Sequence, residues 1–403
     1  MPAETQALTY EQDIHAPADQ VYRAFTNSTA LREWFCDLAT SAPHPGGHLY
    51  FKWNSGYYAN GKFSELVPDR SISFIWRGEG EPWESQVKVS LEQEGQVTHL
   101  RLEHSGLGSG QEWEALIKGL HNGWQETLDN LVSVLETGAD QRFVRRPMLG
   151  ILAGEFTPQV AKKLGVPVQQ GIRLDETIEG MGARASGLGK DDVVVAMAGV
   201  PVSDFPSLGN ALRGKHAGDR VEVVFYRGGE KKTTEMELSQ RPIPEIPDSA
   251  KSLADRLGSL YASQEATLQE IFKGVSDSEA SRQPRPGEWS ANQNLAHLIH
   301  SERGWHTWIS DLANGQEAHY DDYGTNQQAR IDGTVAAYPT AVELLAELKR
   351  NCTETVVMVS KLPEDFMARK GSFWRLAYNL LQTPYHFDEH CEAMRAALAA
   401  AKR

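Results

Sequence analysis

Three histidines near the C-terminus have the residue type and spacing of a metal site. His386 and His390 are four residues apart, so a helix would place both imidazoles on one face, about one turn apart. His297 would add a third nitrogen from a neighbouring antiparallel helix. Three imidazoles with one open coordination position are what a catalytic divalent metal needs. No other part of the sequence resembles a reactive centre, and the pattern leaves the catalytic residues unknown.

The alternative is that these are solvated helix histidines, which are common in a chain with 13 histidines. The residues after His297 favour a metal site, because Ser301 and Gly304 follow at i+4 and i+7 and leave room for a metal and its bound water. This strip of small residues supports His297 rather than its neighbour His300. Three imidazoles suit zinc, nickel, iron or copper, and we expect zinc or nickel.

Length, charge and cysteine usage limit the class of protein. A chain of 403 residues predicts two to four domains. Its net charge of −14 disfavours nucleic acid or an anionic membrane as a partner, and no apolar run approaches the ~20 residues that span a bilayer. Three scattered cysteines (Cys36, Cys352 and Cys391) and the lack of a signal-peptide pattern predict a cytoplasmic protein.

The C-terminal part of the sequence has a helical pattern. Residues 241–248 contain three prolines in six residues, which forbid a helix and favour an extended spacer. Apolar residues then recur with a helical period over residues 250–273, about 290–313, about 340–361 and about 373–400. This pattern predicts an all-α four-helix bundle. Pro384 is expected to kink or restart the fourth helix just before the histidine pair.

Two motifs in these helices resemble the DinB-like superfamily. The first, at the entry to the second helix, is Pro286-Gly-Glu-Trp-Ser-Ala-Asn-Gln-Asn-Leu-Ala-His-Leu298, and the second is Pro384-Tyr-His-Phe-Asp-Glu-His390. The resemblance implies that His297, His386 and His390 hold a divalent metal. It also implies thiol-dependent transfer or isomerisation as the activity. Spacing leaves open whether Asp388 and Glu389 hydrogen-bond to the ligands.

The N-terminal part predicts a sheet followed by one long amphipathic helix. Alternation over residues 85–91 and 98–103 indicates strands with one solvated face, and an apolar stripe runs from Trp113 to Leu135. Motifs such as Leu31-Arg-Glu-Trp-Phe35 and Gly123-Trp-Gln-Glu-Thr-Leu128 resemble the START-like (SRPBCC) superfamily, in its branch similar to the activator of the heat-shock ATPase. The resemblance implies a helix-grip fold with an apolar-ligand cavity, although such aromatic residues more often simply fill a core. The expected cavity walls are Trp53, Phe74, Trp76, Trp113 and Trp124.

The sequence between the N-terminal and C-terminal parts has a third pattern. The segments Met148-Leu-Gly-Ile151 and Gly218-Asp-Arg-Val-Glu-Val-Val-Phe-Tyr226 resemble a PDZ domain of the bacterial HtrA type. A Leu-Gly-Ile turn leaves backbone N–H groups that can hold a terminal carboxylate, and the following edge strand can accept a peptide. The alternative is a spacer with a closed groove. The sequence has no serine protease motif, so we exclude proteolysis. The expected peptide-binding residues are Leu149, Gly150, Ile151, Leu208 and Leu212.

Together these patterns predict a multidomain α+β protein with a START-like domain (1–140), a β-rich PDZ domain (141–244) and a four-helix bundle (249–403). One hypothesis is a metal-dependent transferase or hydrolase of stress response or detoxification, whose START-like domain captures a small apolar ligand. A second is a non-enzymatic adaptor that contacts a chaperone and a protein C-terminus. A third is a small-molecule sensor. Whether the three histidines bind a metal with one open position distinguishes the first from the others.

Overall fold

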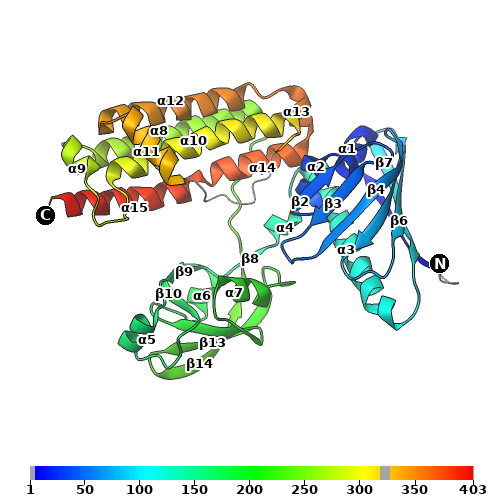
Figure 1. The fold of residues 1–403 in the computed structure, drawn as a ribbon, viewed down its shortest axis with the longest axis horizontal. Helices are drawn as coiled ribbons and strands as arrows, with labels where there is room; N and C mark the ends of the chain where they lie inside the picture. The colour runs from blue at the N-terminus through cyan, green and yellow to red at the C-terminus, as the bar shows by residue number, and fades with distance from the viewer. Residues whose placement is uncertain (1–4, 318–326, 403) are drawn as a thin grey trace. The chain divides into compact units, whose positions relative to one another are not determined.

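The chain is described by a computed structural model over residues 5–317 and 327–402, which form two compact units (Figure 1). One unit joins the segment up to Asp140 with the segment from Pro244 onward, and the other contains residues 141–243. The predicted multidomain α+β fold class is confirmed, with a sheet domain, a second β-rich part and a helical part. Among the described helices, none combines the length and apolar composition needed to cross a membrane.

The N-terminal segment is a seven-stranded antiparallel sheet in the order β1-β7-β6-β5-β4-β3-β2. Buried and exposed residues alternate along β6, as the sequence predicts for a sheet with one solvated face. The short strand β2 was not predicted from the sequence. The strands are β1 (Gln6–Ile14), β2 (Leu38–Ser41), β3 (His48–Lys52), β4 (Tyr58–Val67), β5 (Ser71–Gly78), β6 (Ser85–Glu94) and β7 (Val97–Leu107).

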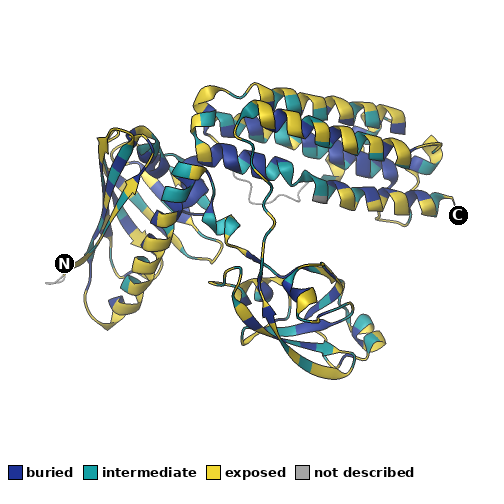
Figure 2. Ribbon diagram, turned by 180° about the vertical axis from the view of Figure 1, so that it is seen from behind, coloured by how far each residue is buried: buried dark blue, intermediate teal, exposed yellow. Residues whose placement is uncertain are grey.

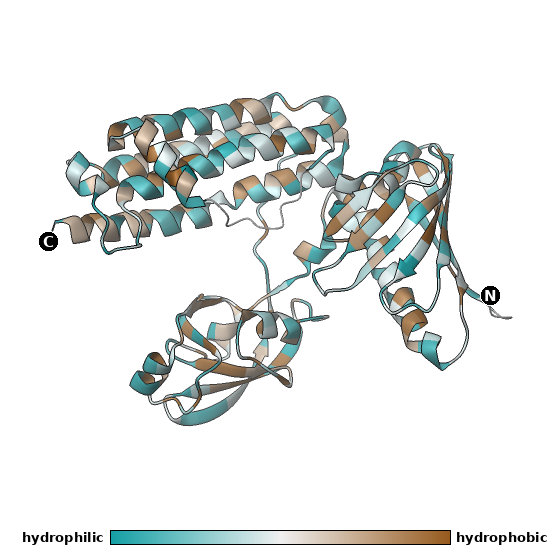
Figure 3. Cartoon of the chain, viewed as in Figure 1, coloured by the Kyte–Doolittle hydropathy of each residue, from teal (hydrophilic) through white to brown (hydrophobic). Residues whose placement is uncertain are grey.

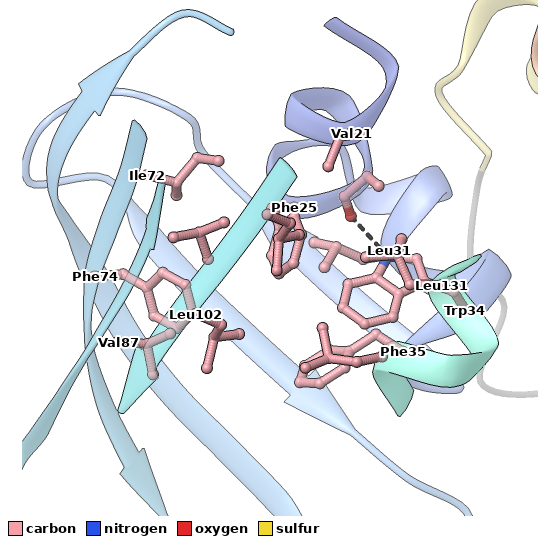
Figure 4. Packing of buried hydrophobic residues seen from close by; sticks show 14 of the residues in the cluster. Val21, Phe25, Leu31, Trp34, Phe35, Ile72, Phe74, Val87, Leu102 and Leu131 are labelled. Carbon is pink, nitrogen blue, oxygen red and sulfur yellow. Dashed lines mark hydrogen bonds between the residues drawn. The ribbon is translucent and has the colours of Figure 1, made fainter. Parts of the chain in front are cut away.

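Three helices accompany this sheet: α1 (Ala18–Thr26), α2 (Ser28–Trp34) and the long α3 (Gln111–Thr137). The sequence predicts one helix from Pro17 through Leu31, and the structure divides it at Asn27. The Asn27 side chain accepts a hydrogen bond from the backbone N–H of Ala30 and so caps a new helix. Aromatic side chains of α1, α2 and the sheet then fill the core (Figure 4).

The imidazole of His104 is completely buried beside this core. His104 is 0 % exposed, its Nδ1 accepts a hydrogen bond from Trp124 Nε1 at 3.1 Å, and its Nε2 lies 2.7 Å from Ser85 Oγ. Because an indole N–H can only donate, the proton of the neutral imidazole is on Nε2 and is donated to Ser85. Burial lowers the pKa of His104 to about 4.

The central unit (residues 141–243) is built on a second antiparallel sheet, in which β14, β13, β11, β10 and β9 follow in that order and β12 pairs with β11. A separate two-stranded pair, β15 with β8, joins its two ends. Its strands are β8 (Pro147–Met148), β9 (Ile151–Gly154), β10 (Ile172–Thr177), β11 (Val193–Met197), β12 (Val200–Pro201), β13 (Arg220–Arg227), β14 (Glu230–Glu237) and β15 (Ser239–Gln240), and its helices are α4 (Gln141–Val144), α5 (Pro158–Leu164), α6 (Gly182–Ala185) and α7 (Phe205–Ala211).

The C-terminal part is a helical bundle whose long helices carry a buried face and an exposed face (Figures 2 and 3). The fourth predicted helix is two helices in the structure, because it ends at Leu381 and restarts at Thr383 with Pro384 in the first turn. The helices are α8 (Ala250–Ile271), α9 (Asp277–Ser281), α10 (Ala291–Asn314), α11 (Gln327–Ala337), α12 (Ala341–Ser360), α13 (Glu364–Ala368), α14 (Lys370–Leu381) and α15 (Thr383–Ala401).

Helix α14 joins this bundle to the N-terminal segment within the same compact unit. Ser372 Oγ donates a hydrogen bond to the buried carboxyl group of Glu33 in α2. Glu317 lies 3.1 Å from Arg32 and 2.6 Å from Arg375, and its side chain is only 5 % exposed. These contacts join polar and charged groups from both parts of the unit, so each part supplies partners for buried groups of the other.

The buried histidine gives the N-terminal segment a predictable pH dependence. In the unfolded chain, His104 takes up a proton near its ordinary pKa of 6.5. In the folded protein, His104 stays neutral until the pH falls to about 4. The free energy of unfolding should therefore fall by up to roughly 3 kcal/mol between these pH values. His104→Gln should flatten this dependence in urea unfolding followed by tryptophan fluorescence. The exposed control His48→Gln should keep the wild-type slope, and equal slopes for all three proteins would contradict the assignment.

Candidate metal centre

The three histidines predicted from the sequence come together between helices α10 and α15. Ser290 begins α10 with a capping box, since its side chain accepts from Gln293 N–H and the Gln293 side chain accepts from Ser290 N–H. This fixes the helix start seven residues before His297. Helix α15 restarts at Thr383 and presents His386 and His390 from successive turns.

The imidazoles point the same nitrogen toward one another. His386 Nε2 lies 2.9 Å from His297 Nε2 and 3.1 Å from His390 Nε2. A tetrahedral ion with metal–nitrogen bonds of about 2.0–2.1 Å separates its nitrogens by roughly 3.4 Å, so small side-chain shifts would suffice to ligate it. A proton on one nitrogen can form a good hydrogen bond in only one of these two contacts, whereas a cation can bind all three nitrogens. The donor set therefore fits a divalent metal.

Two amide side chains orient the outer nitrogens of the cluster. His390 Nδ1 lies 2.8 Å from Asn294 Oδ1 and donates to it, which leaves the Nε2 lone pair free for a metal. His297 Nδ1 lies 3.0 Å from the Gln327 amide nitrogen. Turning that amide over would place its oxygen there to accept from Nδ1–H and would free His297 Nε2 in the same way. Neither amide was predicted from the sequence, although Asn294 lies three residues before His297 on the same helix face.

The other polar candidates near the cluster have different roles. The side chains of Asp388 and Glu389, whose role the spacing left open, are exposed to solvent. His300 Nε2 lies 2.9 Å from Arg330 Nη1 and is not part of the cluster. The structure therefore separates His300 from the three clustered histidines, in agreement with the preference for His297.

Burial keeps the clustered imidazoles neutral. It lowers the pKa of His297 to about 4, with the neighbouring His390 and His386 adding to the shift. Burial and then His386 lower the pKa of His390 to about 4, and burial also lowers the pKa of His386. Neutral imidazole is the form that ligates a metal, so the cluster is ready to bind one at neutral pH.

His386 also lines a cavity beside the cluster. This cavity has a volume of about 470 Å³ and lies among α8, α10, α12 and α15. Its size is within the range of small-molecule sites in proteins. The candidate ligand His386 thus stands between a three-nitrogen cluster and a space that can hold a small molecule.

The aromatic residues predicted to line a cavity in the N-terminal segment divide into two groups. Phe74, Trp76 and Trp124 are buried in one core cluster against which Trp53 packs, and the Trp76 and Trp124 ring centroids are 5.9 Å apart. Trp113 is buried elsewhere, 4.8 Å from the ring of Trp83. Trp53, Trp76 and Trp124 pack around the ring of Phe35, so a ligand would have to displace these rings.

The predicted peptide groove lies in the central unit. Gly150 has φ +75°, which places the Leu-Gly-Ile turn in the left-handed region that glycine tolerates. Leu149, Ile151 and Leu208 line a space of about 10 Å³, and Leu212 packs against the same cluster. This space holds about one water molecule, so a peptide side chain requires the groove to open. Among the described residues, β9 pairs only with β10 and has a free edge.

Three known families match successive parts of the chain, in the order predicted from the sequence motifs. Residues 15–136 match the family described as Activator of Hsp90 ATPase homolog 1-like protein. Residues 148–238 match the PDZ domain family, and residues 259–393 match the DinB superfamily. The three resemblances inferred from sequence motifs are therefore confirmed.

Individual relatives cover only parts of the chain. A probable periplasmic serine protease, do/HhoA-like, from Haemophilus influenzae is 30% identical over 168 residues, which are 41% of this chain and 33% of that protein. The periplasmic pH-dependent serine endoprotease DegQ from Escherichia coli is 26% identical over 95 residues, or 24% of this chain and 21% of that protein. The chain thus spans a third or less of the length of these curated relatives.

Similar solved structures were also found. The Aha1 dimer from Colwellia psychrerythraea is 20% identical, with a TM-score of 0.30, over 32% of this chain and 96% of that chain. CalU16 from Micromonospora echinospora is 28% identical, with a TM-score of 0.27, over 31% of this chain and 73% of that chain.

The outer hydrogen bond to His390 gives a specific prediction. Asn294→Ala removes the acceptor that holds the His390 ring and its tautomer, and loss of such a partner typically weakens metal affinity by about 10–100-fold. Competition with a chromogenic chelator, using zinc and nickel in turn, measures the affinity. Asn379→Ala, an amide in α14 that bonds only its own helix backbone among the contacts described, is the matched control. Equal zinc and nickel affinities in Asn294→Ala and wild type would show that this amide does not support a ligand.

Proposed function

Because the chain joins an Hsp90-ATPase-activator-homologue-like (START-like) domain, a PDZ domain and a DinB-superfamily domain in that order, we propose that it is a metal-dependent enzyme with two binding domains. The bundle (249–403) carries the reaction, the START-like domain (1–140) binds a small apolar ligand, and the PDZ domain (141–244) binds a protein C-terminus. The observation that carries the proposal is the convergence of three neutral imidazole nitrogens beside a cavity.

His297, His386 and His390 would hold the metal through Nε2. A divalent ion bound there would lower the pKa of a bound water or thiol toward neutrality and so supply a nucleophile. The chain contributes three neutral ligands, the Asn294 and Gln327 amides that orient two of them, and a buried environment. Trp289 covers the cluster, with its ring centroid 5.1 Å from that of His297, and limits the access of water.

The reaction class that fits best is transfer or hydrolysis with a low-molecular-weight thiol, as in the DinB-like superfamily. Cys36 is completely buried, and burial raises the pKa of the Cys352 and Cys391 thiols, so none of the three is an activated nucleophile. The thiol would therefore come from a soluble donor. Thiol chemistry suits a cytoplasmic role in detoxification or stress response.

A second candidate function is a non-enzymatic adaptor. The free edge of β9 favours it, because a peptide can add to such an edge by main-chain hydrogen bonds. The N-terminal domain would then contact a chaperone or a client protein. A small-molecule sensor is the third possibility, with the START-like domain as receptor.

Metal content tests the proposal directly. Protein purified without an affinity histidine tag should contain about one divalent metal per chain, measured by elemental analysis. His386→Ala or His390→Ala should lose most of it, because two imidazoles rarely retain a metal that three hold. Since protonated imidazole cannot ligate, metal should be lost as the pH falls, and the lowered pKa values move this loss from about pH 6 toward pH 4.

His300→Ala is the matched control, because His300 is one turn from His297 but contacts Arg330. It should keep the wild-type metal content. If His300→Ala empties the site while His297→Ala does not, the ligands are wrongly assigned. If no variant changes the metal content, the bundle is a structural module and the adaptor function is favoured.

The PDZ domain should prefer peptides with a free C-terminal carboxylate and an apolar last residue, because Leu149, Ile151 and Leu208 line its groove. Amidating the peptide C-terminus removes the charge that the backbone N–H groups would hold and should weaken binding by roughly 1.5–3 kcal/mol. Titration calorimetry with an acid and amide pair measures this difference. Equal affinity for both forms would exclude carboxylate recognition.

A further inference from the structure

The cavity beside His386 is lined mainly by apolar side chains of four helices and is partly open to solvent. Leu268 from α8, Leu298 from α10, Leu345 from α12 and Phe387 from α15 are among its walls. An apolar space of this kind favours hydrocarbon groups, because water inside it has few hydrogen-bonding partners. The polar side chains that line the cavity then determine which polar groups a bound molecule needs.

One of these polar groups is the carboxyl group of Glu302, which is 7 % exposed. Tyr261 from α8 donates to it at 3.1 Å, and Thr355 from α12 donates at 2.8 Å. Burial raises the pKa of Glu302. The charged form of this carboxyl group is thus disfavoured, and the deep part of the cavity tends toward neutrality.

A second polar group lacks a partner. The side-chain nitrogen of Gln264 is buried, lines the cavity and makes no hydrogen bond among the described residues. A buried N–H donor without an acceptor costs roughly 1–3 kcal/mol. A rotation of the Gln264 side chain would bring this nitrogen to the cavity surface, where an oxygen atom of a bound molecule would supply the acceptor that the protein lacks.

The cavity offers an anionic occupant no unpaired cation among the described lining residues. Lys349 is the only lysine or arginine among them, and its Nζ lies 2.7 Å from the Glu265 carboxylate. Its charge is therefore already balanced. A carboxylate or a phosphate in this apolar space would lack a partner for its charge.

We propose that this cavity binds a small, uncharged, mainly apolar molecule that carries a carbonyl oxygen, and that the Gln264 amide donates a hydrogen bond to that oxygen. The inference rests on the proposed function, because it makes this molecule the substrate of the metal centre at His386. It adds the substrate class, which neither the three histidines nor the family resemblance gives.

An uncharged fluorescent ketone, 6-propionyl-2-dimethylaminonaphthalene, tests the cavity without a known substrate. Gly258 lines the cavity, and a Cβ built there has only Val356 Cγ1 near it, at 4.0 Å. Gly258→Leu should fill part of the space and weaken ketone binding at least about tenfold, a loss of about 1.4 kcal/mol. Gly333→Leu in α11 is the matched control, because Gly333 also has room for a Cβ and does not line the cavity.

Gln264→Leu tests the hydrogen bond. It should weaken ketone binding by about three- to tenfold, the scale of one neutral hydrogen bond. It should leave binding of N-phenyl-1-naphthylamine unchanged, because that uncharged probe has no carbonyl group. The anionic probe 1-anilinonaphthalene-8-sulfonate should bind more weakly than the ketone.

These measurements can overturn the inference separately from the proposed function. Ketone binding unchanged by Gly258→Leu, with helical circular dichroism intact, would place the probe elsewhere and exclude the cavity. Tighter binding of the anionic probe at the cavity would exclude the charge argument. Metal-free His297→Ala should still bind the ketone. If the wild-type protein binds the ketone but no metal, the proposed metal-dependent function is wrong and the proposed ligand site is kept. If it binds metal but not the ketone, the proposed ligand site is wrong.

Discussion

The candidate metal centre depends on holding three partly buried imidazoles together. Burial makes the charged imidazolium costly, so His297, His386 and His390 stay neutral and their Nε2 atoms face one another. Neighbouring lone pairs repel, and a shared cation relieves this better than one proton can. The arrangement is therefore stable only if α10 and α15 are held in one register. The Asn294–His390 hydrogen bond, which links these two helices directly, contributes to that register.

The cavity follows from the same packing. The space of about 470 Å³ is lined mainly by apolar side chains and is partly open to solvent, since Val342 in its wall is 75 % exposed. Apolar surface that faces water favours an apolar occupant of this space. Its polar groups are also unusual, with a largely satisfied Glu302 beside an unsatisfied Gln264 nitrogen. Both features are understandable if a small molecule completes the interior.

The ligand-bearing helix is tied to the N-terminal segment as well. Helix α14 carries Ser372 and Arg375, whose partners are Glu33 and Glu317, and the chain then passes through Gln382 directly into α15. Buried ion pairs add little net stability, but breaking one leaves an uncompensated charge. We infer that these contacts mainly fix the position of α14.

The sequence by itself determined the elements and the local part of the site. Strict alternation predicted β6 and β7, the apolar stripe predicted α3, and the i, i+4 spacing of His386 and His390 placed both on one face, because strand and helix periods are local properties of the backbone. Tertiary structure alone decided the separation of Trp113 from the other aromatic residues and the small size of the space beside Leu208. It also decided the roles of Gln327, Glu302 and Gln264, since each depends on which face of a distant helix packs opposite, and no local period encodes that choice.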